Sequence, residues 1–233
     1  MKKLGIVALV LVALAGLLYL KYPFGWWRYR MTVTVETPEG IKTGSAVREV
    51  NAHREPDVGE NAGAGSYVRG EAVVVDLGAR GTLFALLRGQ NSVDHAEDIV
   101  FHMFPMPDGP GGGLTREGIW YYSRLKDAKA TLPIDKYPML VRFKDINDPK
   151  TVERVDPNNL AASFGDGVKL VSASIEITSD PVTTGVEKKL GWLREYYGKM
   201  LDGERYETIE AKNRLANSLG SGSFSTEVHY DNK

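Results

Sequence analysis

Two histidines and an aspartate are spaced to share one face of a helix. His95, Asp98 and His102 stand at positions i, i+3 and i+7 of the segment 93–104, whose apolar spacing is typical of a helix. Projecting opposite the apolar stripe, the three side chains could bind a divalent metal or act as acid and base in a hydrolase. The two histidines are about 10.5 Å apart along the axis, too far to share one ion unaided. A solvated polar face is the competing interpretation.

An acidic loop offers a second set of potential metal ligands. Asp145, Asn147, Asp148 and Asp156 provide carboxylate and amide oxygens, which calcium prefers. The EF-hand template fails, because its glycine position is taken by Lys150 and its final glutamate is replaced by an aspartate. The same residue types favour turns and helix caps, in which side chains accept from nearby backbone N–H groups. A loose calcium site and a set of capped turns both stay open.

No motif in the sequence specifies a reaction or a cofactor. The patterns G-x-S-x-G and H-E-x-x-H are absent, and the glycine-rich stretch 109–113 is not followed by the Lys-Ser or Lys-Thr of a phosphate-binding loop. Trp120, Tyr121 and Tyr122 could stack on a sugar or a peptide, although core packing is the commoner role of such a cluster. We therefore expect no cofactor. A binding protein is the leading hypothesis, and a hydrolase using His and Asp/Glu residues is the alternative.

Composition indicates a folded domain that does not bind nucleic acid. Hydrophobic residues make up 42% and charged residues 25% of the chain, values near the globular norm that predict a packed core. The net charge of −1 lacks the basic footprint of a nucleic-acid-binding protein. The chain has no cysteine, which excludes disulfides, thiolate catalysis and iron–sulfur clusters.

The N-terminal segment predicts a membrane anchor. Lys2 and Lys3 precede an uncharged run, 4–20, that as a helix would extend about 25 Å, close to the roughly 30 Å hydrocarbon core of a bilayer. The following segment, 19–30, interleaves aromatic with basic side chains, which suits the headgroup layer. We assign residues 1–25 to a transmembrane signal-anchor and residues 26–233 to a single domain.

Two alternatives to this topology stay open. Ala13 and Ala15 would satisfy a signal-peptide cleavage site before Gly16, although cleavage there would leave an apolar N-terminus. The basic residues flanking the apolar run are nearly balanced, so a cytoplasmic domain is the second alternative. The short basic N-terminal tail favours a domain outside the cytoplasm. We therefore expect a single-pass protein of the bacterial inner membrane with a periplasmic domain.

Beyond the anchor, the residue pattern predicts hairpins followed by mixed strands and helices. We expect strands over residues 29–37, 41–50, 67–77, 82–87, 139–143, 151–155 and 168–178, and helices over residues 93–104, 115–128, 156–164 and 184–200. The helix at 115–128 has a strand at 119–122 as its alternative. The segment 82–87 lacks alternation, which indicates a central strand buried on both faces. The pattern predicts an α+β fold with a mostly antiparallel sheet that opens with two hairpins.

Three stretches of the domain carry a resemblance to other proteins. They are Arg142 to Pro157, the pair Glu176 to Thr178 and Pro181 to Thr183, and Tyr29 to Val50 with its turn at Glu36-Thr37-Pro38-Glu39-Gly40. Together they resemble a group of uncharacterised, conserved hypothetical proteobacterial proteins. The resemblance extends from about Tyr29 onward and implies a bacterial source. It implies no activity, ligand or site residue.

These observations favour a membrane-anchored binding or scaffolding module of the bacterial cell envelope. The anchor implies the membrane as one partner, and the absence of a coherent catalytic set in the sequence favours a protein partner in the envelope over a small substrate. A membrane-tethered hydrolase requires His95, Asp98, His102 and Asp145 to converge on one cleft.

Overall fold

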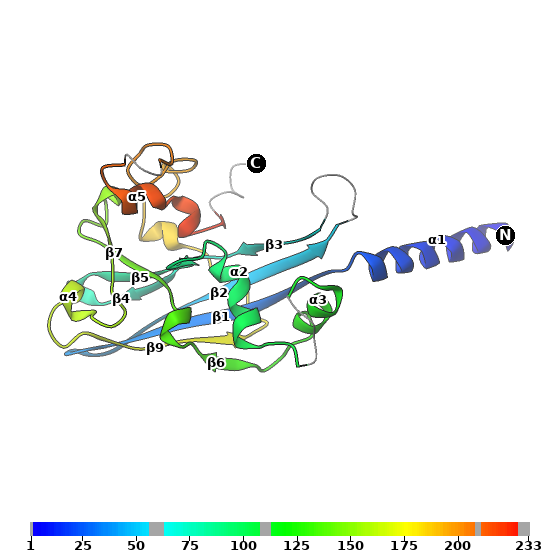
Figure 1. Ribbon diagram of the computed structural model, residues 1–233, viewed down its shortest axis with the longest axis horizontal. Coiled ribbons are helices and arrows are strands. Elements are labelled where there is room, and N and C mark those ends of the chain that lie inside the picture. Colours follow the sequence, from blue (N-terminus) through cyan, green and yellow to red (C-terminus); the bar gives the residue numbers. More distant parts are fainter. Residues whose placement is uncertain (1, 56–62, 108–112, 208–210, 228–233) are drawn as a thin grey trace.

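The chain folds as a long helix followed by a two-sheet domain. The computed structural model describes residues 2–55, 63–107, 113–207 and 211–227, without the side chains of residues 2–4 and 19. Helix α1 (Lys2–Lys21) leads after two residues into strand β1 (Phe24–Thr37). Figure 1 shows α1 projecting from one end of the domain along the direction of β1.

A five-stranded antiparallel sheet forms the longer layer of the domain. Its strand order is β3-β2-β1-β9-β6, where β2 is Gly40–Arg54, β3 is Ala64–Arg69, β6 is Lys129–Thr131 and β9 is Lys169–Ile177. The predicted hairpin between β1 and β2 is confirmed, with Thr37 paired to Gly40 across the turn. Gly40 has a φ of 113°, a conformation that a residue without Cβ adopts readily.

A second, four-stranded antiparallel sheet explains the uninterrupted apolar strand. Its order is β4-β5-β7-β8, where β4 is Val73–Asp76, β5 is Thr82–Gly89, β7 is Pro138–Phe143 and β8 is Val152–Arg154. Successive side chains of β5 enter different clusters: Leu83 and Ala85 join the main core, and Phe84 and Leu86 join a second one with the C-terminal segment. The expectation of a strand buried on both faces is confirmed.

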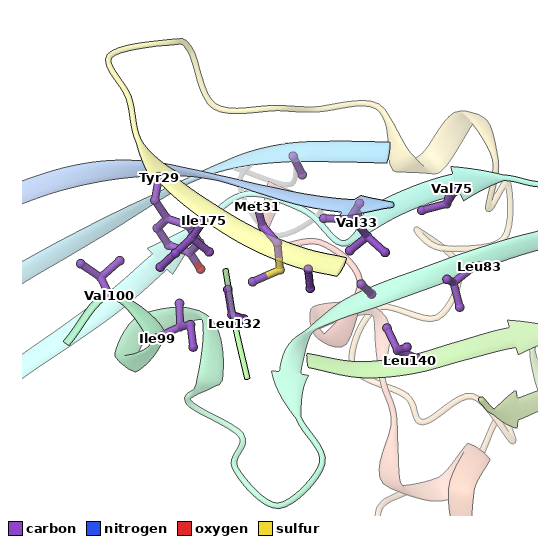
Figure 2. Packing of buried hydrophobic residues seen from close by; sticks show 14 of the residues in the cluster. Tyr29, Met31, Val33, Val75, Leu83, Ile99, Val100, Leu132, Leu140 and Ile175 are labelled. Carbon is purple, nitrogen blue, oxygen red and sulfur yellow. The ribbon is translucent and has the colours of Figure 1, made fainter. Parts of the chain in front are cut away.

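Short helices complete the domain. They are α2 (His95–Met103), α3 (Arg116–Tyr122), α4 (Ala161–Phe164), α5 (Arg214–Ser218) and the 3-10 turns η1 (Gly78–Arg80), η2 (Ile134–Lys136), η3 (Pro149–Thr151), η4 (Val186–Lys188) and η5 (Ser221–Ser223). Thr115 caps α3 by accepting from the Gly118 N–H, so the alternative of a strand at 119–122 is wrong. Figure 2 shows Ile99 and Val100 of α2 facing Tyr29 and Ile175 of the longer sheet.

The strand expected over residues 67–77 is two strands, and this changes the fold. The chain bends at Gly70, which has a φ of 136° and passes close to the Arg48 backbone, where a Cβ would lie 3.1 Å from the Arg48 Cα. As a result β3 pairs with β2 in one sheet, and β4 pairs with β5 in the other. The α+β class is confirmed, but the single sheet that we expected is two antiparallel sheets.

Two expected helices are mostly turns. In the segment 156–164, the Asp156 carboxylate accepts from the Asn158 N–H in a tight turn, and only α4 is helical. In the segment 184–200, η4 is followed by turns, and Gly185 before η4 and Gly198 near the end of the segment have φ values of 118° and 74°, which lie outside the α-helical range. The apolar spacing still reports burial, since Leu190 and Leu193 are fully buried.

The expected anchor segment is helical from Lys2 to Lys21. Among the residues that the structure describes, no helix combines the length and the apolar character needed to cross a membrane.

Candidate functional site: an aromatic and basic pocket at the base of α1

A pocket of about 650 Å³ opens where α1 meets the domain. The first residues of β1, 24–28, form one wall. Trp120 of α3 and the turn after that helix, 123–127, form a second wall, and the end of β9, 177–179, closes it. Three segments that are far apart in the sequence therefore meet directly beside α1.

Strand pairing and one glycine create the pocket. Strand β9 pairs with β1 only from Tyr29 onward, so residues 24–28 extend past the end of β9. Helix α3 packs onto this extension at Gly25, where a Cβ would overlap Ser123 Oγ and Ile119 Cγ2. This close approach brings Trp120 and the turn after α3 beside the first residues of β1.

Aromatic side chains line the pocket at different depths. Phe24 and Trp26 are 66% and 53% exposed, and the Arg28 guanidinium lies 5.1 Å from the Trp26 ring centroid. Trp27 is 3% exposed and lies deepest of these side chains. Trp120 is half-buried, and the Arg116 guanidinium lies 5.5 Å from its ring. The pocket thus offers both open aromatic faces and a buried indole.

Only one member of the predicted stacking cluster reaches the pocket. Tyr122 is 3% exposed and packs in the core, with its ring centroid 5.5 Å from that of Trp27. Tyr121 is half-buried against the same cluster, and Trp120 lines the pocket. Core packing is therefore the role of two of the three rings.

The polar groups of the pocket are mostly donors. Within the described part of the chain, the indole N–H groups of Trp27 and Trp120 are buried without an acceptor. Arg28 is paired with Glu49 at 2.7 Å, whereas the Arg124 guanidinium, among the residues that the structure describes, donates to the Trp120 carbonyl at 3.2 Å and is paired with no carboxylate. Lys126 is exposed and has no hydrogen-bond or ion-pair partner among the described residues. The site is best suited to an acceptor-rich or anionic group.

A second pocket of about 610 Å³ lies beside the end of α1. Lys21, Arg54 and Arg116 contribute cations to its lining, and Glu55 and Glu117 contribute carboxylates. Over the two pockets, six lining residues are cationic and three are acidic: Lys21, Arg28, Arg54, Arg116, Arg124 and Lys126 against Glu55, Glu117 and Asp127. The lining of the two pockets is therefore basic, although the chain as a whole has a net charge of −1.

His95 belongs to the interior and not to a polar face. It is 8% exposed and shares the buried side of α2 with Ile99, so the expectation that it projects opposite the apolar stripe is wrong. The Nε2 atom donates to the Lys136 carbonyl at 2.8 Å, since a carbonyl can only accept. Burial lowers the His95 pKa to about 4, which keeps the ring neutral near pH 7. Asp98 is half-buried and His102 is exposed on the same helix.

The acidic loop residues form capped turns. Asp145 accepts from the Asn147 N–H, and Asp148 accepts from the Lys150 N–H. Asp156 caps its own turn further along the chain. Among the residues described by the structure, no group of three or more His, Cys, Asp or Glu side chains is placed to hold a metal ion. The glycine-rich stretch 109–113 lies almost entirely outside the described residues.

Two further buried charged residues are bonded to the backbone. Arg48 is fully buried and donates to the carbonyls of Glu71, Ala85 and Leu86 at 3.0–3.3 Å. Glu71 is 2% exposed, and its carboxylate accepts from the N–H groups of Gly185 and Val186 at 2.9 and 3.0 Å. Burial raises the Glu71 pKa. These groups hold the two sheets and the C-terminal segment together.

The sequence identified only one wall of the pocket. The aromatic and basic pattern at Trp26, Trp27 and Arg28 is visible beside the apolar run. Arg124 and Lys126 carry no motif, and only the packing of α3 on Gly25 brings them near the first residues of β1.

Comparison with family models, curated proteins and solved structures finds no match to this chain.

Proposed function

We propose that the protein is a single-pass membrane-anchored binding module, with α1 as its anchor and the basic, aromatic end of the domain at the membrane surface. The observation that carries the proposal is the exposure of α1. All described side chains from Gly5 to Leu18 are exposed, and Ile6, Leu9 and Val12 are each more than 60% exposed. An apolar surface of this extent requires a lipid or protein environment.

The end of the domain that adjoins α1 has the chemistry of a membrane interface. Tyr22, Phe24 and Trp26 follow the helix directly, and the cations that line the two pockets surround its end. Aromatic rings with polar tips and basic side chains are favoured at the headgroup layer. In the proposed arrangement α1 lies in the bilayer of a bacterial inner membrane, with the domain on the periplasmic side to bind or scaffold an envelope partner.

Membrane extraction tests the anchor. The full chain should stay in the membrane pellet at alkaline pH in carbonate and be released by detergent. The double substitution Val10→Arg with Leu14→Arg should release it, because a charged residue at a helix centre costs about 3 kcal/mol on insertion. The matched control is Thr43→Arg with Ser45→Arg, which adds the same charge at two exposed residues of β2.

Two results would overturn the proposed function. Release of the unmodified chain by carbonate would show that α1 does not anchor it. Activity of a fluorescent protein, but not of alkaline phosphatase, fused to the C-terminus would place the domain in the cytoplasm. Crosslinking through a photoreactive residue at position 43 or 45, followed by mass spectrometry, would identify the envelope partner expected on the exposed sheet face.

A further inference from the structure

We propose that the pocket at the base of α1 binds the phosphate group of an anionic membrane phospholipid. The inference rests on the proposed function, which places this end of the domain at the bilayer surface. It adds a specific ligand and a specific site to that function. The occupant is a lipid headgroup whose acyl chains remain in the bilayer beside α1.

The charges of the pocket complement an anion. Its cationic lining residues are Arg28, Arg124 and Lys126, and its acidic lining residue is Asp127. Glu49 neutralises Arg28 at 2.7 Å, but the Arg124 guanidinium is bonded to a carbonyl and not to a carboxylate. Lys126 has no partner within the described residues. With Asp127 counted, Arg124 and Lys126 leave the lining with a net charge of +1, which matches the one negative charge of a phosphate diester.

The neutral donors also require an acceptor. A buried N–H group without an acceptor costs about 1–3 kcal/mol, so such groups are uncommon in a finished interior. Trp27 and Trp120 both have an N–H group of this kind, and both residues are among those that line this pocket. Phosphate oxygens are strong acceptors and can take several hydrogen bonds at once. These N–H atoms are themselves inaccessible to solvent, so the exposed cations, and not the indole N–H groups, are the primary contacts proposed for the phosphate.

The position of the pocket selects a lipid over a free anion. Phe24 and Trp26 line it, are more than half exposed and follow α1 in the chain. These rings can contact the glycerol and upper acyl region of a lipid, while the cations contact the phosphate. A free phosphate would make no use of the exposed apolar rings.

Tryptophan fluorescence of the full chain in detergent tests the proposal. Three of the four tryptophans, at positions 26, 27 and 120, line the pocket, so emission reports its occupancy. The probes are dihexanoyl phosphatidylglycerol, dihexanoyl phosphatidylcholine and inorganic phosphate, with both lipids kept below their micellar concentrations. We expect a saturable change with the phosphatidylglycerol lipid and a much weaker response to the zwitterionic lipid, whose choline is repelled by the cations.

Paired charge variants test the site. Arg124→Gln with Lys126→Gln should weaken binding of the anionic lipid about thirtyfold, since each cation contributes roughly a factor of five. Lys129→Gln with Lys169→Gln removes the same charge from exposed strand positions outside the pocket lining and should leave binding unchanged. Circular dichroism melting of each variant confirms that the fold is retained.

Three outcomes would overturn the inference. They are equal binding of the two lipids, an equal effect of the two double variants, and saturation by inorganic phosphate at the same concentration as the anionic lipid. The last result would assign the pocket to a free anion. Because the probes are monomeric lipids, the titration reports on the pocket even if carbonate extraction disproves the anchor, so the two proposals can fail separately.

Discussion

The interior of the domain and the pocket at the base of α1 differ in how their charged side chains are bonded. Arg48, Glu71 and His95 are all less than 9% exposed, and each is bonded to backbone groups of another segment. In the pocket lining, Lys126 has no partner among the described residues, and the Arg124 guanidinium donates to a carbonyl and not to a carboxylate. Buried polar groups that are bonded to the backbone serve the fold, whereas exposed cations without a carboxylate partner remain available to a ligand.

Removing Arg48 should have the largest effect on stability. Arg48→Ala deletes a fully buried side chain and leaves three carbonyls without this donor, so we expect a loss of about 3–5 kcal/mol in the free energy of unfolding. Arg48→Met retains much of the volume and should lose less. Urea denaturation of both variants in detergent measures this. Equal stability of Arg48→Ala and the unmodified chain would contradict the structural role.

Removing the Glu71 carboxylate should cost somewhat less. Glu71→Ala leaves the N–H groups of Gly185 and Val186 without their acceptor, and we expect a loss of about 2–3 kcal/mol. Hydrogen exchange should show the greatest loss of protection at these two amides. If exchange instead increased uniformly over the domain, Glu71 would not specifically hold the segment that begins at Gly185 in place.

His95 should make the domain less stable in mild acid. Its pKa is about 4 in the folded state and about 6.5 in the unfolded state, so between these values the unfolded chain binds more protons. Stability is complete above pH 6.5 and falls as the pH is lowered, by on the order of 2 kcal/mol at pH 5. His95→Gln should remove this part of the pH dependence in urea titrations at pH 7 and pH 5. Identical slopes for both proteins would show that His95 does not remain neutral.

Neutralising the pocket should have the smallest effect on stability. Arg124→Gln with Lys126→Gln removes exposed side chains that have no carboxylate partner among the described residues, and we expect a change below about 0.5 kcal/mol in thermal unfolding. The same variant is expected to bind the anionic lipid about thirtyfold more weakly. A large loss of stability would contradict the difference between the two regions, because it would show that these cations stabilise the fold.

Local patterns identified most strands but not how they associate. The turn at Thr37 to Gly40 and the alternation of β1 depend on neighbouring residues, so they were predictable from the sequence. The division of 67–77 between two sheets depends on Gly70 passing close to Arg48, which is a contact between distant segments. The helix expected at 184–200 failed for a similar reason. The spacing of its apolar residues indicates which side chains are buried. Buried side chains in successive turns can have the same spacing as those on one face of a helix.

The sequence by itself determined the apolar run, the aromatic and basic residues that follow it, and the α+β class. These depend on composition and on short-range periodicity, which act within a few residues. Only the tertiary structure placed His95 in the interior and brought Arg124 and Lys126 to the first residues of β1. Both results depend on helix packing against a sheet, in which side chains from distant segments exclude water together. Such contacts leave no local pattern in the sequence. The candidate site could therefore be identified only from the tertiary structure.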